Sequence, residues 1–228
     1  MRAAAENVPG LHNCSLVTNS DPESGYASAK NLDDVEMGLL SHWLVNPAKG
    51  DARFLMRPAL QSEVIGQEFD YVVIDCPPRL TTGCINALAA SDFVLIPTQV
   101  ESVAIRSVPH LLGRLKALRD ADVLPHLRIL GMVANMVSAN AKERGSAETK
   151  LLRQVEALAL EIWGSPVKAF KSMLRDSAFY VSATRELEQF DRLSLAVENR
   201  AIREQYEPLF KEIEGRINES IGVAGVSS

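Results

Sequence analysis

Short continuous apolar runs alternate with longer segments of helical periodicity along most of the chain. The runs occupy residues 71–74, 93–97 and 129–134, with a weaker one at residues 166–170. Strands that are apolar at every position are typical of parallel sheets buried on both faces. The runs therefore predict four strands of a mostly parallel sheet.

Between these runs, apolar residues recur at spacings of three and four positions. The spacing predicts helices over residues 82–90, 103–118 and 148–162, and a last helix over residues 194–217. Strands that alternate with helices indicate an α/β fold, a three-layer doubly wound sheet. In such sheets ligands bind outside the carboxyl ends of the strands.

The first part of the chain carries weaker signals. Residues 11–18 are compatible with a short strand, and Asp33 or Asp34 can cap a helix. A second helix is expected over residues 54–64. We expect residues 1–10 to be disordered, residues 11–217 to form one domain, and residues 218–228 to be a flexible tail.

The composition is that of a globular domain, and it limits the partners and the cellular compartment that we expect. Of the 228 residues, 46% are hydrophobic and 23% are charged, and the formal net charge is -5. This charge gives no argument for nucleic acid binding, although a local basic patch stays possible. Cys14, Cys76 and Cys84 lack the spacing of metal ligands and are expected to be reduced thiols. Reduced thiols are typical of a cytoplasmic protein. No run approaches the ~18 residues of a membrane span, so we expect no membrane partner.

One carboxylate falls where this fold places a ligand. Asp75 directly follows the apolar run at residues 71–74. In nucleotide hydrolases such a carboxylate orients water around a magnesium ion that is bound to phosphate. Pro77 and Pro78 then prevent further sheet pairing and stiffen the following loop. The pattern by itself is equally compatible with an aspartate that caps a loop or the next helix.

Three consecutive blocks carry a family resemblance. Residues 69–78 (FDYVVIDCPP), 85–92 (INALAASD) and 94–101 (VLIPTQVE) resemble the Walker B strand, the next helix and the following strand of ParA/MinD-type partition ATPases. The blocks keep the order and nearly the spacing of that family. The resemblance extends more loosely over residues 11–217, and residues 66–101 are its specific part.

The resemblance implies a P-loop NTPase type of fold and a role for each matching residue. Asp75 would be the Walker B carboxylate, a catalytic residue that acts on magnesium through water. Pro77, Pro78 and the loop to Thr82 would form the switch that senses the γ-phosphate. Asn135 would lie near the adenine, where an amide can both donate and accept a hydrogen bond. A simple turn amide is the alternative interpretation of Asn135.

The resemblance also implies ATP and Mg²⁺ as cofactors and three kinds of partner. These are non-specific DNA, a ParB-like protein and a second copy in a homodimer, in plasmid or chromosome segregation. DNA contacts of this kind use basic side chains on phosphates. The candidates here are Arg79, Arg106, Arg114, Lys116 and Arg119, with a weaker group at Lys168, Lys171 and Arg175. A solvated helix face is the alternative interpretation of these charges.

The family's phosphate loop, of the form KGGxxKT, has no match in the sequence. Such a loop cradles phosphates with backbone amides at the start of a helix. Residues 48–51 and 142–147 combine lysine with glycine, but neither segment follows an apolar strand. The DxDPQ-like turn is also absent, although residues 21–23 resemble it superficially. We therefore expect an N-terminally truncated relative that lacks the P-loop strand. It is either a partition ATPase or its remnant, or a non-catalytic interaction module that binds no ATP.

Overall fold

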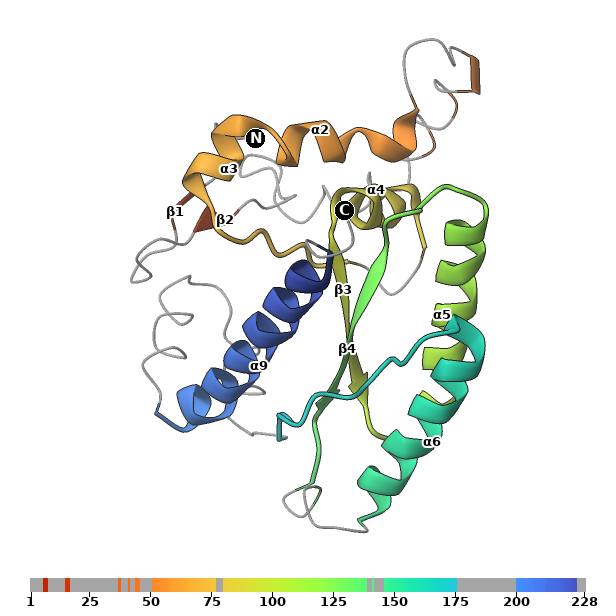
Figure 1. Cartoon of the computed structure of the whole chain (residues 1–228), viewed down its shortest axis with the longest axis vertical. Helices are drawn as coiled ribbons and strands as arrows, with labels where there is room; N and C mark the ends of the chain where they lie inside the picture. The colour runs from red at the N-terminus through yellow and green to blue at the C-terminus, as the bar shows by residue number, and fades with distance from the viewer. Residues whose placement is uncertain are drawn as a thin grey trace. The chain divides into compact units, whose positions relative to one another are not determined.

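The computed structural model describes ten stretches of the chain, which divide into two compact units. The described residues are 6–7, 15–16, 37, 41, 44–45, 51–76, 80–138, 141, 146–175 and 200–224. The first unit covers Met1–Asp92 and the second covers Phe93–Ser228 (Figure 1). Each unit is described by itself.

The first unit holds short elements. Two-residue strands β1 (Glu6–Asn7) and β2 (Ser15–Leu16) pair in antiparallel fashion, so a strand lies in the segment expected to be disordered. The helix expected after Asp33 falls largely outside the described residues. The helix predicted over residues 54–64 is instead divided among three short helices. These are η4 (Ala52–Phe54), α2 (Met56–Leu60) and α3 (Glu63–Glu68).

Helix α4 (Thr82–Ala90) forms the core of this unit and matches its predicted range. It begins at an N-cap, because the Thr81 hydroxyl accepts a hydrogen bond from the Cys84 N–H at 3.2 Å. Most of its residues are buried, and it packs against η4 and α2. Buried Asn86 ties these helices together, since its Oδ1 accepts from the Met56 N–H at 3.2 Å.

The second unit is built on two long parallel strands. Strand β3 (Phe93–Gln99) pairs with β4 (Arg128–Asn135), and α5 (Ala104–Asp120) connects them. Helix α6 (Ala147–Trp163) follows β4. Because parallel neighbours require a crossover, a helix between two such strands is the expected connection. The predictions for these strands and helices are confirmed to within two or three residues.

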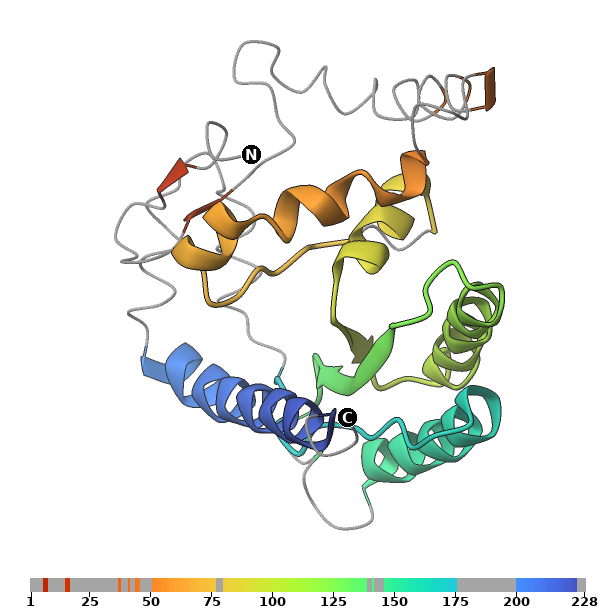
Figure 2. The ribbon, with the colours of Figure 1, turned by 45° about the horizontal axis from the view of Figure 1, so that its top comes forward.

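Strand β4 is buried on both faces, as its continuous apolar run predicted. Val133 packs on one face with Leu209 of α9 (Arg200–Ala224). The next residue, Ala134, packs on the other face with Leu152 of α6. Within this unit, α9 therefore lies on one face of the strands while α5 and α6 lie on the other (Figures 1 and 2). This arrangement has the three layers of an α/β fold.

The weak run at residues 166–170 lies beside β4 without forming a regular strand. Parallel bridges join Met132 to Ala169 and Val137 to Arg175. The Met132 N–H donates to the Lys168 carbonyl at 3.0 Å, and the Phe170 N–H donates to the Met132 carbonyl at 2.8 Å. Residues 166–170 thus extend the sheet beside β4, to which they are joined by these hydrogen bonds.

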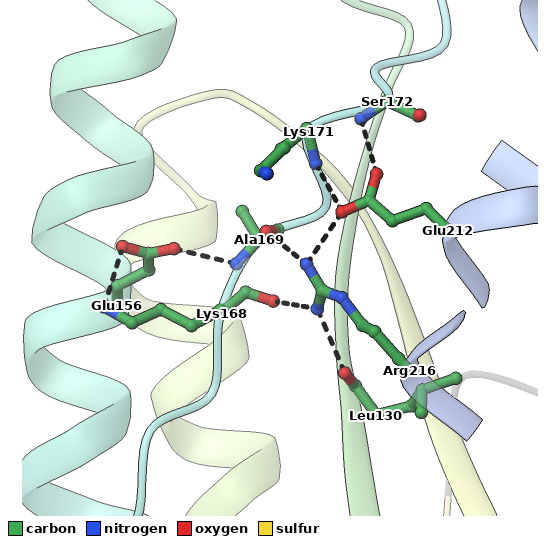
Figure 3. A network of polar contacts seen from close by, with 8 residues as sticks. All are labelled: Leu130, Glu156, Lys168, Ala169, Lys171, Ser172, Glu212 and Arg216. Atoms are coloured by element: carbon green, nitrogen blue, oxygen red, sulfur yellow. Dashed lines mark hydrogen bonds and ion pairs between the residues drawn. The ribbon is translucent and has the colours of Figure 1, made fainter. Parts of the chain in front are cut away.

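Two side chains of α9 form hydrogen bonds with backbone groups of this segment (Figure 3). The Glu212 carboxylate accepts from the N–H groups of Lys171 and Ser172, at 2.9 and 3.0 Å. The Arg216 guanidinium donates to the carbonyls of Lys168 and Ala169, at 3.1 and 2.8 Å. Helix α9 therefore binds to the sheet by polar contacts as well as by apolar ones.

Helix α9 also corrects the predicted tail. It continues to Ala224, so residues 218–224 are helical and do not belong to a flexible tail. Residues 194–199, where the helix was expected to begin, lie outside the described residues.

The prediction of a buried strand at residues 71–74 is wrong for this structure. Residues 71–76 form no strand, and Tyr71, Val72 and Val73 are 56%, 49% and 93% exposed. A strand is stable only when neighbours pair with its backbone and cover its side chains. No described strand pairs with this segment, so its apolar side chains stay in contact with solvent. Asp75 therefore does not end an interior parallel strand.

Candidate functional site

The carboxyl ends of β3 and β4 bring two amide side chains next to each other. Gln99 and Asn135 are direct partners in the parallel register, at the last residue of each strand. The Gln99 amide nitrogen lies 2.9 Å from the sulfur of Met136, which follows Asn135. Parallel sheets bind their ligands at this edge. The predicted position of Asn135, at a strand end, is confirmed.

Met136 has a backbone conformation that is uncommon for its residue type. Its φ is 55°, in the left-handed region where side chains other than glycine are rarely found. The Asn135 Oδ1 accepts a hydrogen bond from the Met136 N–H at 2.9 Å and supports this turn. No described residue accepts a hydrogen bond from the Asn135 amide nitrogen, which leaves this donor available to a ligand. No signal in the sequence predicted the unusual Met136 conformation.

Asp75 is a solvent-accessible carboxylate in the first unit. It belongs to the extended segment 71–76, and no ion pair among the described residues involves it. Burial raises the pKa of the neighbouring Cys76 thiol, and the negative charge of Asp75 raises it further. Asp75 therefore offers free oxygen atoms, which are the ligands that magnesium prefers.

The switch predicted after Asp75 is only partly within the described residues. Pro77 and Pro78 lie outside them, as does Arg79. Thr82 lies in the first turn of α4 and is 8% exposed, and its carbonyl accepts from the Asn86 amide at 3.1 Å. The adjacent Thr81 is more accessible and caps the helix through its hydroxyl. Sequence reasoning missed Thr81, although a threonine before an apolar helix is a recognised cap signal.

The predicted basic residues on α5 fall into two groups. Lys116 is paired with Asp120 at 2.5 Å. Arg119 stacks on the Trp163 ring, 3.9 Å from its centroid, and donates to the Trp163 carbonyl. By contrast, Arg106 and Arg114 are exposed, and no ion pair of the described residues involves them. These two side chains are the ones left to meet an external anion.

Lys168, in the weaker basic group, is paired with Glu156 at 3.6 Å.

Among the described residues, no cluster of three or more His, Cys, Asp and Glu side chains is arranged for a metal ion. Within the same residues, no helix has the length and apolar character needed to cross a membrane.

Comparison with known proteins supports the sequence resemblance. The AAA domain family model matches residues 27–129. The chain is 35% identical over 109 residues to the chromosome-partitioning ATPase Soj of Thermus thermophilus, covering 48% of this chain and 40% of that protein. It is 29% identical over 161 residues to the chromosome partitioning protein ParA of Myxococcus xanthus, covering 65% and 55%. The chain thus spans about half the length of the curated relatives it matches.

A solved structure shows the same fold. The chain matches apo McdA from Cyanthece with a TM-score of 0.54 and 17% sequence identity, over 77% of this chain and 65% of that one. The parallel strands, their helical layers and this match define an α/β fold of the P-loop NTPase type. Over the residues matched by sequence, the chain is similar to ParA-type partition ATPases.

Proposed function

We propose that this chain is part of a ParA-like ATPase that segregates plasmid or chromosomal DNA in the cytoplasm. The observation that carries the proposal is the family match over residues 27–129, which includes Asp75 and its flanking blocks. Matching relatives include a chromosome-partitioning ATPase and a chromosome partitioning protein. Non-specific DNA, a ParB-like partner and a second copy of the chain are the partners that this function requires.

Asp75 fits the magnesium role through its exposure and its lack of a described ion-pair partner. Magnesium is usually held by one or two carboxylates, with water and phosphate oxygens in its other positions. A single accessible carboxylate is therefore sufficient from the protein side. Bound Mg²⁺ would neutralise phosphate charge during γ-phosphoryl transfer. Asp75 would orient the water molecules of the ion, and Pro77, Pro78 and Thr82 would form the γ-phosphate switch.

Asn135 fits the adenine role through its amide nitrogen. Its oxygen is already used by the Met136 N–H, so the side chain is held in one orientation. The remaining donor suits a ring nitrogen of a base, which is an acceptor. A side chain that is held in place before the ligand arrives loses little entropy on binding.

Magnesium-dependent ATP binding tests this proposal. We expect a fluorescent ATP analogue to bind only with Mg²⁺, and Asp75→Asn to weaken this binding at least about tenfold, or ~1.4 kcal/mol. Asp70→Asn is the matched control, because Asp70 is an exposed aspartate in the same stretch of chain and lacks the family role. Unchanged binding by Asp75→Asn would remove the magnesium assignment.

The second candidate is a non-catalytic ParA-like interaction module. It is favoured by the exposed segment 71–76, since an Asp75 that is not fixed by a sheet is poorly prepared for catalysis. Absence of magnesium-dependent binding at millimolar ATP would support this module and contradict the ATPase.

A further inference from the structure

Positive charge is concentrated on helix α5, although the formal net charge of the chain is -5. The helix carries Arg106, Arg114, Lys116 and Arg119, and its single acid is Asp120 at the last position. The Asp120 carboxylate lies 2.5 Å from the Lys116 ammonium and 3.8 Å from the Arg119 guanidinium, so it balances charge at the end of the helix. The charges of Arg106 and Arg114 are left without an acid on the same helix.

His110 lies between these two arginines on the exposed face of α5. Arg106, His110 and Arg114 are spaced by four positions, which makes each a neighbour of the next on a helix surface, with Cβ atoms about 5–6 Å apart. All three are exposed, whereas Val108 and Leu112 are buried on the opposite face. At a rise of about 1.5 Å per residue, the three residues span about 12 Å along the helix. They form what is called here the α5 stripe.

No charged group of the described residues neutralises the α5 stripe. Within that part of the chain, none of its three side chains takes part in an ion pair or a hydrogen bond. Strand β3, which packs against α5, has no charged residue. On α6, which also packs against α5, Glu148 accepts a hydrogen bond from the Ser138 hydroxyl and Glu156 accepts one from the Ala169 N–H. The exposed charged residues of α6, none of which forms an ion pair with the stripe, are Lys150, Arg153 and Glu161.

We propose that the α5 stripe binds the phosphate backbone of duplex DNA, with His110 as a third cationic contact that forms at acidic pH. DNA as the partner rests on the proposed function. Histidine is the side chain that gains a positive charge within the range from pH 8 to pH 5. A charged imidazole ring donates from both nitrogens and attracts phosphate oxygens, as the flanking guanidinium groups do. DNA binding should therefore become tighter as the pH falls through this range.

The salt dependence of DNA binding measures the number of cationic contacts. Each phosphate that a cation neutralises makes the slope of log K against log salt steeper by about 0.9. At about pH 6 we expect the unmodified protein to show a slope that is steeper than at about pH 8 by up to that amount. Its affinity at a fixed salt concentration should be several-fold higher at the lower pH. Fluorescence anisotropy of a labelled duplex DNA of mixed sequence, in a salt series at each pH, measures both quantities.

Three substitutions assign the effect to His110. His110→Gln removes the titratable group, so the slope should keep its shallow value at both pH values. His110→Lys supplies a permanent charge, so the slope should be steep at both. His126→Gln is the matched control and should retain the pH effect, because His126 is exposed and lies beyond the end of α5. Since His110 is also exposed, we expect its variants to fold, and circular dichroism checks this.

The possible outcomes separate the role of His110 from the proposed function. A pH effect that persists in His110→Gln, or disappears in His126→Gln, would overturn the role of His110. A shallow slope of His110→Lys at pH 8 would overturn the cationic contact. DNA binding by the unmodified protein with one slope at both pH values would contradict the role of His110 alone. Absence of DNA binding at either pH, in the unmodified protein and in His110→Lys, would contradict the proposed DNA partner itself.

Discussion

Gly131 is the position in the second unit where the absence of a side chain matters most. Its φ is 150°, at the margin of the range that favours glycine. An added Cβ would overlap the Arg216 guanidinium and lie 2.6 Å from the Lys168 carbonyl oxygen. Because that guanidinium also stacks 3.7 Å from the Phe170 ring centroid, it has little room to move.

We therefore predict that Gly131→Ala lowers the free energy of unfolding by roughly 2–3 kcal/mol, as expected for overpacking in a core. Urea denaturation followed by circular dichroism measures this change. Gly215→Ala is the control, because Gly215 is helical and nothing would contact its Cβ. There we expect a gain of about 0.5–1 kcal/mol. Equal effects of the two substitutions would contradict the role assigned to Gly131.

Single residues also show how far the sequence could predict the site. The strand-end position of Asn135 followed from an apolar run that ended in a polar side chain. The left-handed Met136 was not predictable, because methionine has no preference for that conformation.

At the scale of elements, the binding of α9 to the sheet depends on Glu212. Burial raises the pKa of this carboxyl, but the N–H groups of Lys171 and Ser172 and the Arg216 guanidinium hold it below its ordinary value of 4.5. A carboxyl with a lower pKa in the folded than in the unfolded state stabilises the fold above its unfolded pKa. That stability is lost as the pH falls through the folded pKa.

We predict that Glu212→Gln lowers the free energy of unfolding at pH 7 by about 1–3 kcal/mol, because a charged acceptor of hydrogen bonds is lost. It should also weaken the loss of stability between about pH 5 and pH 3 that the unmodified protein shows. Denaturation series at several pH values measure both effects. Glu214→Gln, an exposed neighbour on the same helix, should change neither quantity. Identical acid sensitivity of the Glu212 variant and the unmodified protein would exclude this contribution.

The elements differ in how well their patterns predicted them. Helix α4 and the strands β3 and β4 were predicted closely, because their signals come from neighbouring residues. Residues 71–74 carry an equally apolar run and yet form no strand among the described elements. An apolar pattern indicates that a segment favours burial. Whether the segment pairs as a strand depends on distant parts of the chain. The segment at residues 166–170 lies between these cases, bonded to β4 without becoming a regular strand.

At the scale of the whole molecule, the proposed DNA partner should meet Arg106 and Arg114. Each phosphate contact lowers the slope of log K against log salt by about 0.9. We predict that Arg106→Ala and Arg114→Ala each reduce the steepness of this slope by about that amount. Fluorescence anisotropy of labelled duplex DNA at several salt concentrations measures it. Lys211→Ala, which removes an exposed charge from α9, should leave the slope unchanged. A similar loss from this control would indicate a diffuse charge effect instead.

The sequence by itself determined the similarity to partition ATPases, the residues that carry it, and the alternation of strands and helices. These features depend on local order along the chain, where side-chain type and spacing act directly. The tertiary structure decided which apolar runs are paired, how α9 binds the sheet through Glu212 and Arg216, and which arginines remain free. Such outcomes depend on contacts between residues far apart in the chain, and burial of a segment requires a partner that its own sequence does not specify.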